Sequence, residues 1–422
     1  MYYLLDGDNF FASVEVLYAP HLRHKELVVL SSADGNVVAR SKLAKKNGVK
    51  MGVPYFQIKD EFEARGGVAH ASNFPLYARS SVQVACAIES LLGPCDRYSI
   101  DESFGVSDGL EITIDKHGGH EAYARFIKNT VQQQTGIAIS VGVGATKTLA
   151  KAAAYGAKKY PATKGVVAIE SRERLEKLLK LMPVGNVWGI GRKFEEKLLA
   201  MGISTAWDLK SSDQARMRKV FGVTLQRVIA ELNGEVCFGL EFEAPAQKQM
   251  VSSKTFTERV MDQDIIRGHL SQHAEKLASK LRNRKAQAKR LTIFIQNSPF
   301  DKSAPFRYLS RTAEFTTHSN DTSKFHAVIH QLLIAIWQNG LRYSKCGVMV
   351  SELVELKHKQ LGLFDEKEPR NKVELMNILD KINAKQACGV SFASTFLKPP
   401  AIPSAKLSPN YTGSWSEVPK VH

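Results

Sequence analysis

The sequence predicts an α+β protein built from several domains. Its 422 residues exceed the length at which a single hydrophobic core stops growing. Strand-like and helix-like segments alternate up to about Gly165, and they alternate again after Val251. Between these mixed regions, residues 172–233 show only helical patterns separated by short turns. Two mixed layers joined by a helical region explain this order.

The first mixed region combines short apolar strands with amphipathic helices. Its expected strands cover 2–5, 26–30, 36–40, 98–104 and 137–143, and its expected helices cover 12–18, 123–134 and 147–158. The turn Asp34-Gly35 separates the second and third strands and is a strong hairpin signal. This succession predicts a central sheet with helices on one face.

The second mixed region has β-α-β-β-α-β order, which is the ferredoxin-like arrangement. Its expected elements are strand 251–260, helix 265–288, strands 291–296 and 307–315, helix 323–339 and strand 345–353. The polar stretch 241–250 before it indicates a linker. The segment after Glu355 is polar and rich in proline, so we expect it to be disordered or ordered by a partner.

Charge and cysteine content limit the possible partners and compartment. The formal charge of +16 favours a polyanionic partner, with nucleic acid ahead of an anionic membrane surface. No apolar stretch reaches the roughly 18 residues of a membrane span, and the early acid Asp6 is unlike a signal peptide. The five cysteines are scattered without CxxC spacing, which argues against zinc and disulfides and fits a reducing cytoplasm.

Two acidic runs predict the chemistry. Asp6-Gly7-Asp8 follows the first strand, and Asp101-Glu102 lies in the segment 98–104. If these strands are neighbours, three or four carboxylates converge and need cations, for which Mg²⁺ is suited. Two such ions commonly support in-line displacement at phosphorus. An isolated Asp-Glu pair is more often a solvated turn, so the prediction depends on both runs.

Two basic motifs favour contact with DNA. The turn Trp188-Gly189-Ile190-Gly191 before Arg192 fits either a helix-hairpin-helix, whose backbone N–H groups approach a phosphate, or a plain turn between helices. The expected helix 265–288 ends in a basic cluster too dense to serve only its own dipole. This cluster consists of Arg282, Arg284, Lys285, Lys289 and Arg290.

Three smaller features fit a nucleotide or a partner. Lysines on the helices after residues 40 and 146, including Lys45 and Lys158, are either solvated or able to reach a triphosphate. Phe10 and Phe11 cannot both face one core because they are adjacent, so one ring could press on a sugar. The apolar run at 360–364 within the polar tail is typical of a peptide that docks into a partner.

Taken together, these motifs resemble the Y-family translesion DNA polymerases. Within that family the chain is similar to the UmuC-type catalytic subunits of bacterial SOS mutagenic polymerases. The motifs that carry the resemblance are residues 6–15, 98–103, 140–151, 187–192 and 360–365, and residues 407–412 fit as well. The resemblance therefore extends from the N-terminus to the tail.

The resemblance implies a right-hand polymerase with a ferredoxin-like palm, small fingers, a helical thumb carrying the helix-hairpin-helix, and a ferredoxin-like little finger. The implied boundaries are palm 1–11 and 72–168, fingers 12–71, thumb 169–238, linker 239–250, little finger 251–354 and tail 355–422.

The resemblance also implies site roles. Asp6, Asp101 and Glu102, with the Gly7 carbonyl, would hold two Mg²⁺ ions. Phe11 would be the steric gate that collides with a ribose 2′-OH, beside Phe10 at the nucleotide. Lys158 would meet the triphosphate. Many members carry a Tyr-x-x-Arg pair on the fingers, whereas this chain has Lys42-x-x-Lys45; Lys45 supplies charge without the bidentate fork of arginine.

The implied function is template-directed translesion DNA synthesis in the SOS response. The implied partners are primer-template DNA, dNTPs, a sliding clamp, a processed UmuD-type dimer and the RecA recombinase, with no membrane. The clamp would bind Gln360, Leu361, Leu363 and Phe364. Two alternatives stay open, namely a metal-dependent nuclease and a non-catalytic, clamp-tethered accessory protein that binds DNA.

Overall fold

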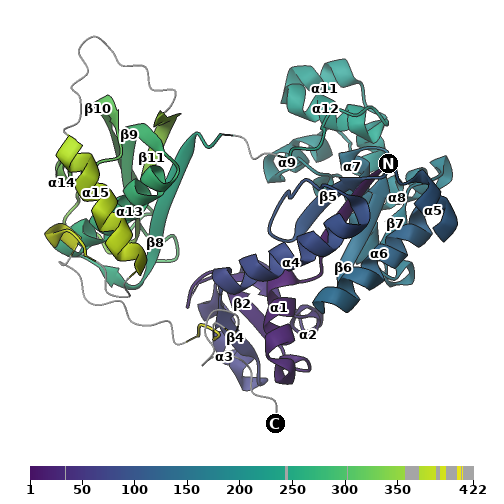
Figure 1. The fold of residues 1–422 in the computed structure, drawn as a ribbon, viewed down its shortest axis with the longest axis horizontal. Helices are drawn as coiled ribbons and strands as arrows, with labels where there is room; N and C mark the ends of the chain where they lie inside the picture. The colour runs from purple at the N-terminus through teal and green to yellow at the C-terminus, as the bar shows by residue number, and fades with distance from the viewer. Residues whose placement is uncertain are drawn as a thin grey trace. The chain divides into compact units, whose positions relative to one another are not determined.

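The computed structural model of the chain describes residues 1–33, 35–242, 246–301, 303–356, 370–385, 390–395, 406–409 and 411. The chain divides into two compact units (Figure 1). The first unit contains Met1–Ala244 and Ser404–His422, and the second contains Pro245–Pro403. Among the helices in the described ranges, none is long and apolar enough to cross a membrane.

A four-stranded sheet of order β5-β1-β6-β7 forms the centre of the first unit. Its strands are β1 (Tyr2–Gly7), β5 (Glu102–Val106), β6 (Ile139–Gly144) and β7 (Val166–Ala168). β1 runs antiparallel to β5 and β6, and β7 runs parallel to β6. The predicted strand over 98–104 therefore begins only at Glu102, after a bend.

Helices cover both faces of this sheet, so the prediction of helices on one face is wrong. Tyr3 and Leu5 share a core with α4 (Phe74–Leu92) and α6 (His120–Thr135), whereas Leu4 packs on α7 (Lys147–Lys159). Every residue of β6 is buried, as expected for a strand that is covered on both faces. A Cβ on Gly142 would lie 2.2 Å from the Ala154 nitrogen, so glycine lets α7 approach closely.

A smaller sheet of order β3-β2-β4 lies in the same unit. It contains β2 (Leu27–Leu30), β3 (Val37–Arg40) and β4 (Val68–Ala71), accompanied by α1 (Phe10–Tyr18), α2 (Lys42–Lys46) and α3 (Lys59–Ala64). β2 pairs antiparallel with β3, which confirms the predicted hairpin partners, although Asp34 of the turn lies outside the described residues.

The helical region of the first unit is confirmed. It consists of α8 (Arg172–Leu181), α9 (Arg192–Ala200), α10 (Ala206–Lys210), α11 (Gln214–Phe221) and α12 (Val223–Leu232). Leu149 and Ala153 of α7 belong to the core of this region. The buried carboxylate of Glu231 accepts a hydrogen bond from the Thr148 nitrogen at 2.8 Å. Helix α7 is therefore fixed by the central sheet on one side and the helical region on the other.

The second unit has the predicted β-α-β-β-α-β order. Its elements are β8 (Gln249–Val260), α13 (Gln263–Asn283), β9 (Ala286–Asn297), β10 (Tyr308–Ser319), α14 (Thr322–Ile336) and β11 (Tyr343–Glu355). The sheet order is β10-β9-β11-β8, and all neighbours are antiparallel. Helices α13 and α14 share its core (Figure 1), whereas most of β10 is exposed or half-buried.

The boundary between α13 and β9 differs from the prediction. The helix ends at Asn283 rather than at residue 288, because Lys285 adopts a left-handed conformation with φ 51°. Ala286 and Ala288, which favour a helix in isolation, instead pair with β11. Sheet pairing outweighs local propensity here.

The prediction of a disordered tail is wrong for the parts that the structure describes. Residues Arg370–Lys385 form helix α15, whose Asp380 binds Arg282 of α13 with Oδ2 2.6 Å from Nε. Farther along, the Lys406 carbonyl accepts a hydrogen bond from the Ala71 nitrogen of β4 at 2.8 Å. Polar contacts hold these segments together with apolar packing, since Met376 of α15 is buried and Tyr411 stacks on Tyr18.

Candidate active site

The sheet of the first unit brings the two acidic runs together. Asp6 of β1 lies directly opposite Glu102, the first residue of β5, although 95 residues separate them in the chain. The Gly7 nitrogen donates to the Asp101 carbonyl at 2.8 Å, which extends the pairing past the end of β5. Antiparallel register therefore places these acids at one edge of the sheet, as the sequence predicted.

Asp6 has the most perturbed acidity at this edge. Its side chain is nearly buried, and burial raises its pKa to about 7. The ammonium of Lys158 opposes this shift, and the negative charge of Glu102 adds to it. A carboxylate in this position gains from any cation that approaches it.

Two lysines of α7 neutralise the facing carboxylates. Lys158 Nζ lies 2.5 Å from Asp6 Oδ1, and Lys151 Nζ lies 3.1 and 3.0 Å from the two oxygens of Glu102. Lys151 also lies over the ring of Tyr98, 4.6 Å from its centroid. Lys151 is one of the lysines that the sequence places on the helix after residue 146, but no pairing with Glu102 was predicted for it. Its spacing of seven residues from Lys158, two helical turns, was the available signal.

The other acids of the two runs have separate partners. Asp8 accepts from the Ser140 hydroxyl at 2.7 Å, and Asp101 accepts from the Ser99 hydroxyl at 2.6 Å. Within the ranges that the structure describes, no three His, Cys, Asp or Glu side chains form a preformed metal cluster. The structure therefore joins Asp6 and Glu102 directly, and it places Asp101 next to Glu102 in the chain with its carbonyl hydrogen-bonded to the Gly7 nitrogen.

The two adjacent phenylalanines differ in burial, although both pack on the core of the first unit, so the prediction that they cannot face one core is wrong. Phe10 is 3% exposed and belongs to the core of the first unit, so its ring has no free face for a nucleotide and that expectation is corrected. Phe11 is half-buried and stacks on Tyr77, with ring centroids 4.4 Å apart. Of the two, Phe11 is the ring that a nucleotide could meet.

Lys45 on α2 belongs electrostatically to the same site. Partial desolvation and the nearby cations Arg40 and Lys158 lower its pKa, whereas Asp8 and Asp6 act in the opposite direction. Lys45 and Lys158 therefore lie close enough to repel each other, although they come from α2 and α7. Two cations placed this way are suited to a polyphosphate.

The predicted turn before α9 is present. Gly191 is the N-cap of α9, and Gly189 has a φ of 87°, a conformation that favours glycine. Arg192 is exposed and pairs with Glu196 one turn along the helix. Trp188 is half-buried and donates its indole N–H to the Tyr98 hydroxyl at 3.1 Å.

The basic cluster of the second unit is divided by the fold. Arg282 is mostly buried and bound to Asp380, which removes its guanidinium from a DNA-facing role. Arg284 caps the end of α13, and Lys285 follows it. Lys289 and Arg290 belong to β9, where Arg290 pairs with Glu314 and Glu352. The predicted clamp-binding residues 360–364 lie outside the described residues.

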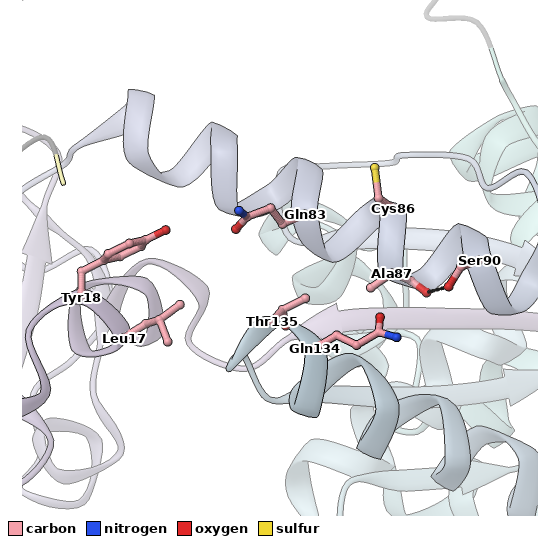
Figure 2. Close-up of a pocket in the computed structure, with 8 residues that line it drawn as sticks. All are labelled: Leu17, Tyr18, Gln83, Cys86, Ala87, Ser90, Gln134 and Thr135. Carbon is pink, nitrogen blue, oxygen red and sulfur yellow. Dashed lines mark hydrogen bonds between the residues drawn. The ribbon is translucent and has the colours of Figure 1, made fainter. Parts of the chain in front are cut away.

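An open cavity of about 770 Å³ lies elsewhere in the first unit, among α1, α4 and α6 (Figure 2). Its lining consists of Leu17, Tyr18, Gln83, Cys86, Ala87, Ser90, Gln134 and Thr135. It contains none of the predicted site residues. The carboxylates and lysines described above therefore define the candidate active site.

Family models match four parts of the chain. The impB/mucB/samB family matches residues 5–155, and its C-terminal domain matches 247–363. The helix-hairpin-helix motif of the IMS family matches 172–203, which covers the turn before α9. A domain of unknown function, DUF4113, matches 374–421 in the tail.

Several curated proteins are similar along their whole length. SamB of Salmonella typhimurium is 38% identical, and MucB of Escherichia coli is 37% identical, with 99% of each chain covered. UmuC of Salmonella typhimurium is 37% identical, with 100% of each chain covered. A solved Y-family DNA polymerase chimera of Dbh and Dpo4 is similar in fold, with a TM-score of 0.65 and 22% identity; the match covers 84% of this chain and 99% of that one.

Proposed function

The chain belongs to the impB/mucB/samB family as a UmuC-type Y-family DNA polymerase, and we propose that Asp6, Asp101 and Glu102 are its catalytic carboxylates. It is a DNA-directed DNA polymerase of the translesion class, and we propose that it acts in the SOS response. The observation that supports the proposed site is the direct pairing of Asp6 with Glu102 at the end of β1.

The donors at this site fit divalent cations. They are hard oxygen atoms, and the raised pKa of Asp6 reflects burial and a carboxylate repulsion that a cation would relieve. We propose that Asp6, Asp101, Glu102 and the Gly7 carbonyl hold two Mg²⁺ ions. When bound, these ions would lower the pKa of the primer 3′-OH and offset charge on the leaving pyrophosphate.

The lysines of the site would bind the incoming nucleotide. Lys158 lies 2.5 Å from Asp6, so it is placed to exchange this carboxylate for a phosphate oxygen once the nucleotide enters. Lys45 would add a second positive charge from α2 and offset charge that develops on the pyrophosphate. Lys151, held by Glu102 and the ring of Tyr98, would keep Glu102 oriented.

Phe11 would select the sugar. It is the half-buried member of the aromatic pair and lies four residues after Gly7 on the first turn of α1. A ribose 2′-OH would collide with its ring, whereas a deoxyribose would fit. Discrimination between correct and incorrect nucleotides would depend mainly on base pairing, so distorted templates would be accepted.

The remaining basic groups would grip the DNA backbone without reading its sequence. We assign this role to Gly189, Gly191 and Arg192 at the start of α9 and to Arg284, Lys285, Lys289 and Arg290 in the second unit. Arg282 is left out because its side chain is mostly buried against Asp380, whereas Arg290 stays exposed despite its ion pairs. The palm, fingers, thumb, little finger and tail would follow the boundaries implied by the sequence.

The partners follow from the family relationship. We propose primer-template DNA and dNTPs as substrates, a processed UmuD-type dimer and RecA as protein partners, and the sliding clamp as the partner of residues 360–364. A DNA polymerase of this kind would act in the cytoplasm.

End-labelled primer-template DNA tests the function against its rivals. Incubated with Mg²⁺ and dNTPs, the wild-type chain with any required partner subunits should lengthen the primer, and without dNTPs the primer should keep its length. Shortening of the strand in either mixture would assign a nuclease. No change in length under any condition, together with tight DNA binding, would support the accessory protein.

A further inference from the structure

A buried carboxylate beside the site takes no part in the proposed chemistry. Glu15 on α1 is fully buried. Its Oε1 accepts from the Tyr77 hydroxyl at 2.5 Å and from the Ser408 hydroxyl at 3.0 Å, and its Oε2 lies 3.0 Å from His70 Nδ1. A buried charge is tolerated only when it is well paired, so these donors matter to its position.

Tyr77 connects this carboxylate to the proposed steric gate. Its ring stacks on that of Phe11, with centroids 4.4 Å apart and planes inclined by 15°. Phe11 and Glu15 are four residues apart and lie on one face of α1, so Tyr77 contacts both. Burial, with Glu15 adding to it, raises the pKa of Tyr77, so the phenol keeps its proton and remains a donor.

The third member of this chain of contacts comes from the tail. The Asn73 side-chain amide donates to the Ser408 carbonyl at 3.2 Å, to the Ser408 hydroxyl at 3.1 Å and to the Pro409 carbonyl at 3.2 Å. Asn73 also caps α4, the helix that carries Tyr77, by accepting from the Leu76 nitrogen. Ser408 is only 5% exposed, so this contact is buried and does not lie on the surface.

We propose that Ser408 of the C-terminal tail is a positioning residue for sugar selection, acting through Glu15 and Tyr77 on the ring of Phe11. This inference rests on the proposed role of Phe11 as the steric gate. Ser408 fixes the carboxylate of Glu15, the carboxylate fixes the Tyr77 hydroxyl, and the Tyr77 ring supports one face of Phe11. The tail thereby contributes to the choice between deoxyribonucleotides and ribonucleotides.

The physical reason is the sensitivity of a steric gate to small displacements. A buried carboxylate that loses one of its donors shifts towards those that remain. Tyr77 would follow it, and the Phe11 ring would lose part of its support. Because the gate works by collision, a ring that can yield admits the 2′-OH at lower cost.

The test measures kcat/KM for a dNTP and the matching rNTP on undamaged primer-template, using the full chain with any partner subunits that the wild type requires. Ser408→Ala removes the hydroxyl, and Tyr77→Phe keeps the ring while removing its hydrogen bond to Glu15. Each should lower the preference for dNTP by about threefold to tenfold. The double variant should lose little more than the larger single loss, because both act through Glu15.

Lys406→Ala is the matched control in the same tail segment. It removes the ammonium over the Tyr55 ring, 4.2 Å from its centroid, and leaves the Ser408 hydroxyl in place, so its sugar preference should equal that of the wild type. An equal loss of dNTP preference in Lys406→Ala would show that any weakening of tail docking has this effect, and it would overturn the role of Ser408. If Ser408→Ala lowers the yield of folded protein, Tyr77→Phe still tests whether the hydrogen bond to Glu15 positions the Phe11 ring.

Phe11→Ala distinguishes failure of the proposed steric gate from failure of the contacts that position it. If it relaxes the sugar preference while Ser408→Ala and Tyr77→Phe leave it unchanged, the positioning chain is refuted and the gate stands. If Phe11→Ala itself changes nothing, the proposed gate fails and this inference fails with it.

Discussion

Two charged regions of the molecule differ in how the fold places their side chains. They are the acidic edge of the first sheet, formed by Asp6 and Glu102, and the basic segment 282–290 of the second unit. Asp6 and Glu102 are far apart in the chain, yet β1 and β5 place them face to face. Residues 282–290 are contiguous, yet the end of α13 and the start of β9 separate their side chains. Strand register brings the charged side chains together at the first site, whereas the helix boundary separates them at the second.

The difference shows why density of charge along a chain is a weak guide to a site. At the acidic edge, the unfavourable pairing of two carboxylates is maintained and offset by Lys158 and Lys151. In the basic segment, Arg282 forms an internal ion pair with Asp380, so its guanidinium is not available to DNA. A carboxylate whose pKa stays raised although a lysine pairs with it, as for Asp6, indicates function better than an arginine held in an ordinary internal ion pair.

The largest expected effect is at the acidic edge. Glu102→Gln removes the charge opposite Asp6 while keeping the shape of the side chain, and it should lower nucleotide incorporation by about a thousandfold. DNA affinity should stay within about twofold, since the proposed contacts to the DNA backbone are made by other residues. Rapid-quench incorporation and fluorescence anisotropy measure the two quantities. Loss of both together would make Glu102 a folding residue.

Phe11→Ala should have the next largest effect. Removing the ring opens the space that a ribose 2′-OH would occupy, so ribonucleotide incorporation should rise by on the order of a hundredfold relative to dNTP. Steady-state kinetics with matched dNTP and rNTP measure this ratio. Phe10→Leu is the control, because Phe10 lies in the core and should alter stability without changing the ratio.

In the basic segment, Arg282→Ala should act on stability rather than on DNA binding. It leaves Asp380 half-buried without its partner, which should cost about 2 kcal/mol in the free energy of unfolding. Urea denaturation measures this loss. Arg284→Ala at the exposed helix end should leave stability unchanged and weaken DNA binding at low salt. Reversed results for the two arginines would contradict the comparison.

The smallest effect concerns pH. Burial raises the pKa of Asp6 to about 7, so protons compete for this carboxylate as the pH falls towards 6. The Mg²⁺ concentration for half-maximal incorporation should therefore rise by about threefold to tenfold between pH 8 and pH 6. Between pH 8 and pH 9 it should stay constant. A constant requirement over the whole range would remove Asp6 from the metal site.

The sequence predicted the two acidic runs and the order of elements in the second unit because these depend on local patterns, whereas α4, β4 and β7 of the first unit were not predicted. The run of apolar residues before Asp6 located β1, and the β-α-β-β-α-β order of the second unit was confirmed. The end of α13 was missed because Ala286 and Ala288 favour a helix until β11 pairs with them. Ser408 was beyond reach for a similar reason, since its contact with Glu15 spans 393 residues.

Primer extension across a single abasic site, with Mg²⁺ and dNTPs, tests the central claim most directly when wild type and Asp101→Asn are compared. Both proteins would be assayed at equal DNA occupancy, with any partner subunits that the wild type requires. We predict that the wild type extends past the site and that Asp101→Asn, bound equally well, adds no nucleotide. Equal extension by Asp101→Asn would contradict the assignment of this carboxylate to catalysis.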